Sequence, residues 1–292
     1  MDSSVNRGQW GGGAIRAAAV QLNNTEDRDR NLQVADRLVR AAAAEGARLV
    51  VLPERLDMRG RNEVYEREAE GLDGAVGQWA GALAGELGID LVAGSISERR
   101  EGHDKLSNTS MHFGPDGELK AAYRKIHMFD VVVGNIEYRE SAAHEPAEEV
   151  VVSETADGSG LGLTICYDLR FPELYRILAL RGARIVTIPS NFTKPTGEAH
   201  WEVLNRARAI ENQVFVIAPG QIGEQLPEGE SYGSSMIVDP WGVVLARARD
   251  EDGECFVAAE LDLERQDEVR QKLPSLANRI PGAYRWPEEV RA

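Results

Sequence analysis

The sequence repeats one plan twice, in which strands alternate with helices and a β-hairpin follows. In the first half, the hairpin turns at Gly114-Pro115-Asp116-Gly117, and in the second half at Asp239-Pro240-Trp241-Gly242. Hydrophobic periodicity predicts strands over residues 14–22, 48–52, 90–97, 108–113, 119–123, 161–166, 184–189, 214–218, 236–238, 243–246 and 256–261. It predicts helices over residues 27–45, 77–87, 172–181, 200–212 and 263–272.

This order predicts an α+β fold of two mixed sheets. An amphipathic helix must bury its apolar face, so each sheet is expected to carry helices on one face. The two uncovered faces would then stack and form a four-layer α-β-β-α sandwich. A single doubly wound sheet would give a similar pattern and stays open as the alternative. No linker rich in Gly, Ser or Pro divides the middle of the chain, so residues 14–272 are expected to form one domain.

The two ends of the chain are expected to lie outside this domain. Residues 1–13 are polar and Gly-rich, without the apolar stretch of a secretory signal, which predicts a disordered leader. Residues 273–292 hold three prolines and little periodicity, which predicts a tail that packs on a partner subunit.

Charge and composition exclude several classes of protein. The net charge of −15 disfavours nucleic acid and anionic membranes as partners, and no apolar run reaches the length of a membrane helix. Two cysteines are too few for a disulfide scaffold, and they fit a reducing compartment. These features predict a soluble, cytoplasmic protein.

Cys166 is the candidate nucleophile, because it ends an expected strand shortly before an expected helix. A strand-to-helix turn exposes a side chain at the edge of a sheet, and it is expected to lower the thiol pKa. The alternative is a small buried hydrophobic residue, which is also our interpretation of Cys255.

Two further charged residues stand at the ends of expected strands. Glu54 follows the apolar run of residues 49–52, and Lys125 follows a hairpin strand; a solvated surface charge is the alternative for each. None of the five histidines has a context that marks it as a base, and none has metal-ligand spacing with Cys or an acid. We interpret them as structural: His103, His112, His127, His144 and His200.

Three segments, in this order, resemble the motifs that carry the Glu–Lys–Cys triad of the nitrilase superfamily of carbon–nitrogen hydrolases. They are Leu52-Pro53-Glu54, Tyr123-Arg124-Lys125-Ile126-His127 and Ile165-Cys166-Tyr167-Asp168-Leu169-Arg170-Phe171-Pro172-Glu173. The similarity continues through residues 200–212 and 232–242, and it covers about residues 15–284. The chain looks most like the Nit branch, which contains omega-amidase and deaminated-glutathione amidase. The resemblance implies the α-β-β-α sandwich, homodimers or larger assemblies, and no metal or organic cofactor.

The resemblance also implies roles for single residues. Glu54 would be the general base, Cys166 the nucleophile, and Lys125 with the backbone N–H of Tyr167 would stabilise the oxyanion. A second glutamate after the lysine matches Glu140 best and Glu137 less well. The loop between Lys125 and Glu140 is about one residue shorter than in the omega-amidase pattern and lacks a proline near Gly134-Asn135, which leaves the substrate open.

Substrate contacts are expected from the strand next to that of Cys166. Asn191, Phe192 and Thr193 follow this strand and should line the pocket. Arg170 could bind a substrate carboxylate, but an ion pair with Glu173 or Asp168 is the favoured interpretation. The helix over residues 200–212 carries an apolar stripe that predicts packing or a subunit interface: Val203, Leu204, Ala207 and Ile210.

The predicted function is hydrolysis of a non-peptide amide through a cysteine thioester, with release of ammonia. The substrate would be the ω-amide of a small carboxylic or 2-oxo acid, or deaminated glutathione. A nitrilase proper, an N-carbamoyl amino acid hydrolase or an aliphatic amidase would share the triad. A non-catalytic interaction protein and a redox cysteine protein are the alternatives of other classes.

Overall fold

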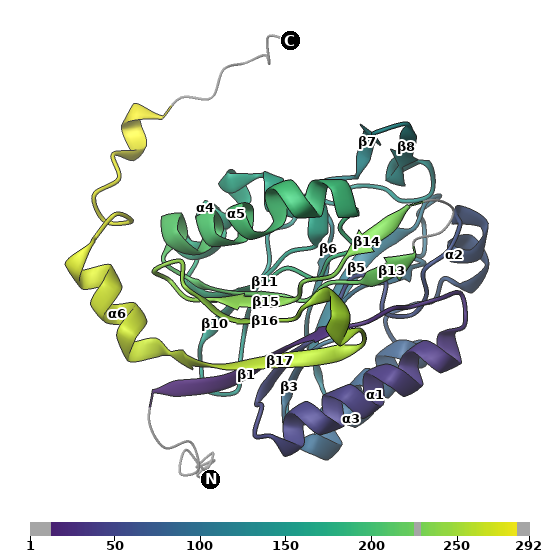
Figure 1. Cartoon of the computed structure of the whole chain (residues 1–292), viewed down its shortest axis with the longest axis horizontal. Coiled ribbons are helices and arrows are strands. Elements are labelled where there is room, and N and C mark those ends of the chain that lie inside the picture. The colour runs from purple at the N-terminus through teal and green to yellow at the C-terminus, as the bar shows by residue number, and fades with distance from the viewer. Residues whose placement is uncertain (1–12, 225–228, 285–292) are drawn as a thin grey trace.

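A computed structural model describes residues 13–224 and 229–284 of the chain. Two mixed sheets stack face to face, and helices cover the outer face of each (Figure 1). The predicted four-layer α-β-β-α sandwich is thereby confirmed. Except for Gly13, the predicted leader lies outside the described residues, as do residues 285–292 of the predicted tail.

The first sheet combines the N-terminal half of the chain with one late strand. Its strands, in spatial order, are β17 (Cys255–Asp262), β1 (Ala14–Gln21), β2 (Leu49–Val51), β3 (Asp90–Val92), β5 (Ser107–Phe113) and β4 (Ile96–Glu98), with β6 (Leu119–Arg124) paired to β5. Since β17 lies antiparallel to β1 along eight residues, the last strand closes the first sheet rather than extending the second. The two halves of the chain are therefore joined at this edge.

The second sheet is built from the C-terminal half alone. Its strands, in spatial order, are β16 (Val244–Arg247), β15 (Met236–Val238), β12 (Phe215–Ala218), β11 (Ala183–Thr187), β10 (Gly160–Leu163) and β9 (Val152–Glu154). The neighbours β10, β11 and β12 run parallel. Side chains at their carboxyl ends are therefore brought to one edge of the sheet.

Helices cover the outer faces of the two sheets, and further helices, hairpins and turns lie outside these layers. The first sheet carries α1 (Arg28–Ala44) and α3 (Ala75–Leu87), and the second carries α4 (Pro172–Leu180) and α5 (Lys194–Asn212). The remaining elements are α2 (Asn62–Glu68), α6 (Leu263–Lys272), the hairpins β7 (Asp130–Val133)–β8 (Ile136–Arg139) and β13 (Ile222–Glu224)–β14 (Glu230–Tyr232), and the 3-10 turns η1 (Glu140–Ala142), η2 (Cys166–Arg170), η3 (Asp250–Asp252) and η4 (Pro281–Ala283). No helix of the described ranges combines the length and apolar character that a bilayer crossing requires.

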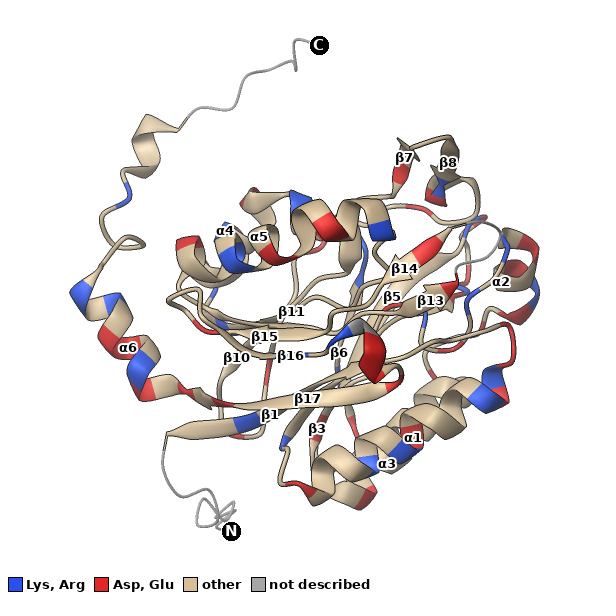
Figure 2. Ribbon diagram, viewed as in Figure 1, with Lys and Arg blue, Asp and Glu red and all other residues tan. Residues whose placement is uncertain are grey.

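The alternation of side chains along β1 explains the layers. Ala17 and Ala19 belong to the core between the two sheets, whereas Ala18 and Val20 pack with the helices of the first sheet. Successive side chains of a strand point to opposite faces, so a strand that is buried on both faces must be apolar throughout. Lys, Arg, Asp and Glu lie mainly on the outer helices and the loops (Figure 2).

Three predictions about individual elements are corrected. The predicted strand 90–97 is interrupted at Gly94, whose φ of +50° and close approach to the Pro53 carbonyl leave no room for a side chain. The segment 125–149, which showed weak periodicity, contains the hairpin β7–β8. The predicted helix 200–212 begins at Lys194, because Pro195 fits the first turn of a helix. The apolar stripe of this helix is divided: Leu204 packs against the core, whereas Val203 and Ile210 are exposed and leave the predicted subunit interface open.

Candidate active site

Glu54 lies at the carboxyl end of β2 and is buried between the two sheets' ends, with 4% of its surface exposed. Its Oε1 atom accepts hydrogen bonds from Asn108 Nδ2 at 2.8 Å and from Lys125 Nζ at 3.1 Å. Its Oε2 atom accepts the backbone N–H of Asn191 at 2.8 Å, and Asn191 follows the parallel strand β11 of the other sheet. The carboxylate is therefore held from three sides at the predicted position of a general base.

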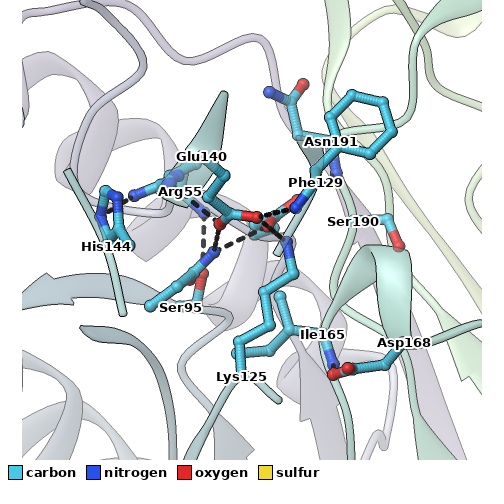
Figure 3. Close-up of polar contacts among 12 residues, drawn as sticks. Arg55, Ser95, Lys125, Phe129, Glu140, His144, Ile165, Asp168, Ser190 and Asn191 are labelled. Atoms are coloured by element: carbon cyan, nitrogen blue, oxygen red, sulfur yellow. Dashed lines mark hydrogen bonds and ion pairs between the residues drawn. The ribbon is translucent and has the colours of Figure 1, made fainter. Parts of the chain in front are cut away.

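Lys125 follows β6, and its side chain extends to the Glu54 and Glu140 carboxylates, from below Glu140 in the view of Figure 3. Its ammonium lies 3.1 Å from Glu54 and 2.7 Å from Glu140, and only 1% of its side chain is exposed. Burial alone would lower the pKa of Lys125, but the carboxylates of Glu140 and Glu54 outweigh it, and the net effect is a raised pKa. Lys125 is consequently a fixed cation at all ordinary pH values.

Cys166 opens the turn η2 after β10 and has a left-handed backbone with φ of +48°. Its backbone N–H donates to the Pro189 carbonyl at 2.9 Å, and its side chain lines the same cavity as Glu54 and Lys125. The expected lowering of the thiol pKa is wrong. Burial and the adjacent Glu54 carboxylate raise the pKa of Cys166 well above its ordinary value, and Lys125 offsets only part of this. The resting group is therefore a neutral thiol that needs a proton acceptor.

Glu140 begins η1, directly after the hairpin β7–β8, and its carboxylate joins the cluster at the centre of Figure 3. One oxygen accepts Lys125 Nζ at 2.7 Å and the N–H of Phe129 at 2.9 Å, and the other accepts Asn108 Nδ2 at 2.9 Å. Burial would raise the pKa of Glu140, but Lys125 and Arg55 lower it to about 2. Glu137 is instead exposed on β8, where it pairs with Arg139 at 2.7 Å, so Glu140 is the second glutamate of the site.

Two residues of this cluster, Asn108 and Arg55, were not identified from the sequence. Asn108 on β5 bridges both carboxylates through one amide nitrogen. Arg55 donates to Glu140 at 3.3 Å and to the ring of His144 at 3.0 Å. Their positions next to Glu54 and within a hairpin strand were visible in the sequence, but nothing in the sequence showed that these side chains turn into the cavity.

The cavity around Cys166 has a volume of about 480 Å³ and opens between α2 and the hairpin β7–β8. Its lining combines four cations with four carboxylates: Arg55, Arg61, Lys125 and Arg139, and Glu54, Glu63, Glu137 and Glu140. The lining thus carries no net charge in a chain of net charge −15. An anionic substrate meets a balanced field there, whereas the average surface would repel it.

Of the three consecutive residues predicted to contact the substrate, one lines the cavity around Cys166 and two do not. Asn191 lines the cavity, whereas Phe192 is buried against Trp201 with ring centroids 5.0 Å apart. Thr193 lines a neighbouring cavity between α5 and the hairpins.

The favoured ion pair of Arg170 is absent. Among the ion pairs of the described residues, none joins Arg170 to Glu173 or Asp168, and its Nη1 lies 3.2 Å from His200 Nδ1. Asp168 is instead engaged by the Tyr123 hydroxyl at 2.7 Å.

The histidines and the acids form no metal centre in residues 13–224 and 229–284, where no group of three or more His, Cys, Asp or Glu could hold an ion. His127 Nδ1 donates to the Asp168 carboxylate at 2.7 Å, and its ring stacks on Phe171, so both contacts are structural. His112 bridges Asp90 and Ser153 at the far end of the sandwich.

Comparisons with known proteins agree with this geometry. A model of the carbon-nitrogen hydrolase family matches residues 16–271. The chain is 39% identical to deaminated glutathione amidase of Synechocystis sp. (strain PCC 6803 / GT-S), over 90% of this chain and 97% of that protein. It is also 39% identical to human omega-amidase NIT2, over 93% of this chain and 97% of that protein. The solved structure of Saccharomyces cerevisiae Nit3, of branch 10 of the nitrilase superfamily, is similar with a TM-score of 0.81 and 35% identity, over 90% of this chain and 95% of that one.

Proposed function

The chain belongs to the carbon–nitrogen hydrolase family of the nitrilase superfamily, and from this premise we propose that it is an amidase specific for carboxylate-bearing terminal amides. The substrates would be the ω-amide of a small carboxylic or 2-oxo acid, or deaminated glutathione. The observation that carries the proposal is the buried cluster in which Glu54, Lys125 and Cys166 line one cavity. The names of the two relatives support the choice of substrate.

The first half of the reaction forms a thioester. Glu54 accepts the proton of the Cys166 thiol as the sulfur attacks the amide carbon, and the electrons of the carbonyl double bond move to its oxygen. Lys125 and the N–H of Tyr167 stabilise this oxyanion, and a charged donor in a site screened from water is worth more than one in bulk solvent. Glu54 then donates its proton to the leaving nitrogen, the C–N bond breaks, and ammonia departs.

The second half restores the enzyme. Glu54 removes a proton from water as the water oxygen attacks the thioester carbon. The C–S bond breaks, Cys166 regains its proton from Glu54, and the carboxylic acid leaves. Throughout both halves Glu140 keeps Lys125 in place and ionised, which is why its own pKa of about 2 matters.

A substrate panel with ammonia detection tests the proposal. The panel contains 2-oxoglutaramate, deaminated glutathione, simple nitriles and N-carbamoyl amino acids. We expect rapid ammonia release from one of the first two, and little from the others. Turnover of the nitriles or the N-carbamoyl amino acids alone would replace the proposal by another branch of the same chemistry. Release from none of them, together with a Cys166 that iodoacetamide does not label, would favour a non-catalytic interaction protein.

We further propose that the protein is a homodimer or larger homo-oligomer. Large apolar side chains are exposed on adjoining surfaces of α5 and of the turn between β15 and β16, where Arg206 donates to the Gly242 carbonyl at 2.8 Å. The exposed fractions are 67% for Val203, 45% for Ile210 and 55% for Trp241. The C-terminal segment after α6 extends away from the body and also exposes Leu273 and Ile280 (Figure 1). A second copy would cover both surfaces, since large exposed apolar areas mark interfaces.

Light scattering coupled to size-exclusion chromatography tests the assembly. We expect a wild-type mass of two or more chains, and a single chain for the double variant Val203→Glu, Ile210→Glu, because each carboxylate would be buried without a partner. A monomeric wild type at micromolar concentration would contradict this. We also propose a cytoplasmic location, because a reducing compartment keeps the Cys166 thiol reactive, and cell fractionation checks this.

A further inference from the structure

Arg55 directly follows Glu54, yet both side chains line the same cavity. Consecutive residues of an extended chain point to opposite sides, so this arrangement needs a reversal. The left-handed backbone of Arg55, with φ of +60°, supplies it. Such a conformation is costly for a residue with a side chain, and it persists where the surroundings fix it. Here the N–H of Arg55 donates to Ser95 Oγ at 3.2 Å, and its carbonyl accepts Asn24 Nδ2 at 2.9 Å.

The guanidinium is buried and clamped. It donates to Glu140 Oε1 at 3.3 Å, to Ser97 Oγ at 2.8 Å and to His144 Nε2 at 3.0 Å. Its central carbon lies 4.2 Å from the centroid of the Tyr65 ring. Among the ion pairs of the described residues, Glu140 is its one carboxylate partner. Figure 3 shows Arg55 between His144 and the Glu140 carboxylate.

The innermost groups of the cavity balance in charge only when Arg55 is counted. Glu54 and Glu140 contribute two negative charges, and Lys125 and Arg55 contribute two positive charges. His144 adds none, because burial and the neighbouring Arg55 lower its pKa to about 3. Without Arg55, a buried cluster would hold one surplus negative charge, and such a cluster binds a proton to remove it.

We propose that Arg55 is a positioning residue of the active site. Its guanidinium holds the Glu140 carboxylate ionised against Lys125, so that the lysine stays a fixed cation and Glu54 is the one carboxylate that exchanges a proton with Cys166. The other titratable groups that face Arg55 and Glu140 are Asp57 from the loop after β2, Tyr65 from α2 and His144 after η1. Asp57 lies outside the residues that line the cavity, and burial raises its pKa to about 6.

The test is the pH dependence of Arg55→Met, and it rests on the proposed amidase function. We expect the acidic limb of kcat/KM for ammonia release to move upward by at least one pH unit, which is a tenfold or greater loss at a fixed pH on that limb. Above the limb, near pH 8.5, the variant should approach the wild-type rate. Arg55→Lys restores the charge and should return the limb to its wild-type position. If Arg55→Met does not fold, Arg55→Gln removes the same charge and retains hydrogen-bonding groups.

A second readout separates this inference from the proposed function. The rate at which iodoacetamide labels Cys166 also depends on Glu54 and needs no substrate, so the same upward shift is expected there. If the wild type hydrolyses nothing in the panel, the proposed function fails, but the labelling profile still tests Arg55.

Two controls identify the responding group. Arg59→Met removes another buried guanidinium, one that binds Asn23 and Ser231. It should leave the acidic limb unchanged both in kcat/KM and in the labelling rate. Asp57→Asn in the Arg55→Met background should leave the limb shifted. An unmoved limb in Arg55→Met, or a limb that Asp57→Asn returns to its wild-type position, would overturn the proposal.

Discussion

Replacing Cys166 by alanine is expected to lower the rate of ammonia release by about 10⁴-fold or more, because residues that act as a unit lose nearly all catalysis when one is removed. No other cysteine can substitute. Cys255, the second one, pairs with Gln21 at the start of β17 and does not line the cavity. The measurement is steady-state ammonia release from the best substrate of the panel.

The matched control is Cys255→Ala, which removes the other thiol of the chain, a half-buried one that does not line the cavity. We expect it to retain the wild-type rate, and we expect both variants to unfold cooperatively. Ammonia release by Cys166→Ala at even one tenth of the wild-type rate would contradict a thioester mechanism. If Cys255→Ala lost activity and Cys166→Ala did not, Cys255 and not Cys166 would be the nucleophile.

The architecture was predictable because the periodicity of its strands is strong. The short apolar runs predicted at residues 48–52 and 184–189 contain β2 and β11, which are buried on both faces except at the half-buried Arg184, as a strand inside a sandwich must be. The pairing of β17 with β1 was not predictable, since it joins residues about 240 positions apart, and pairing between distant segments leaves no local signal. The hairpin β7–β8 had a signal, three valines before Gly134-Asn135, that the weak periodicity of the surrounding segment obscured.

The site was predictable only in part. The resemblance of three motifs pointed to Glu54, Lys125 and Cys166, and their strands do bring them into one cavity. Neither the raised pKa of Cys166 nor the position of Arg55 followed from the sequence. The first depends on burial beside Glu54, and the second on a left-handed backbone that arginine rarely adopts.

Replacing Lys125 by methionine is expected to damage both catalysis and stability. The variant lacks the cation that would stabilise the oxyanion, and loss of one such donor lowers kcat by about 10²-fold to 10³-fold. It also leaves the Glu54 and Glu140 carboxylates buried without the ammonium that lies 3.1 and 2.7 Å from them. Breaking a buried ion pair from one side costs about 3–5 kcal/mol of unfolding free energy.

The pH dependence of this loss distinguishes the buried charge from simple loss of packing. In the wild type, the pKa of Glu140 is lowered to about 2, so its pairing contributes stability above the ordinary glutamate pKa of about 4.3, and this stability is lost as the pH falls towards 2. In Lys125→Met one of the two carboxylates takes up a proton. The difference in unfolding free energy between the wild type and this variant, the stability gap, should therefore be widest near pH 7 and narrow below about pH 4. Denaturant unfolding at both pH values measures it. The control is Lys120→Met, which removes an exposed lysine of β6, the strand that Lys125 follows. Lys120 pairs with Asp116, and its replacement should cost about 1 kcal/mol or less at either pH. A gap for Lys125→Met that is equal at both pH values would mean that the lysine stabilises the site by packing and not by its charge.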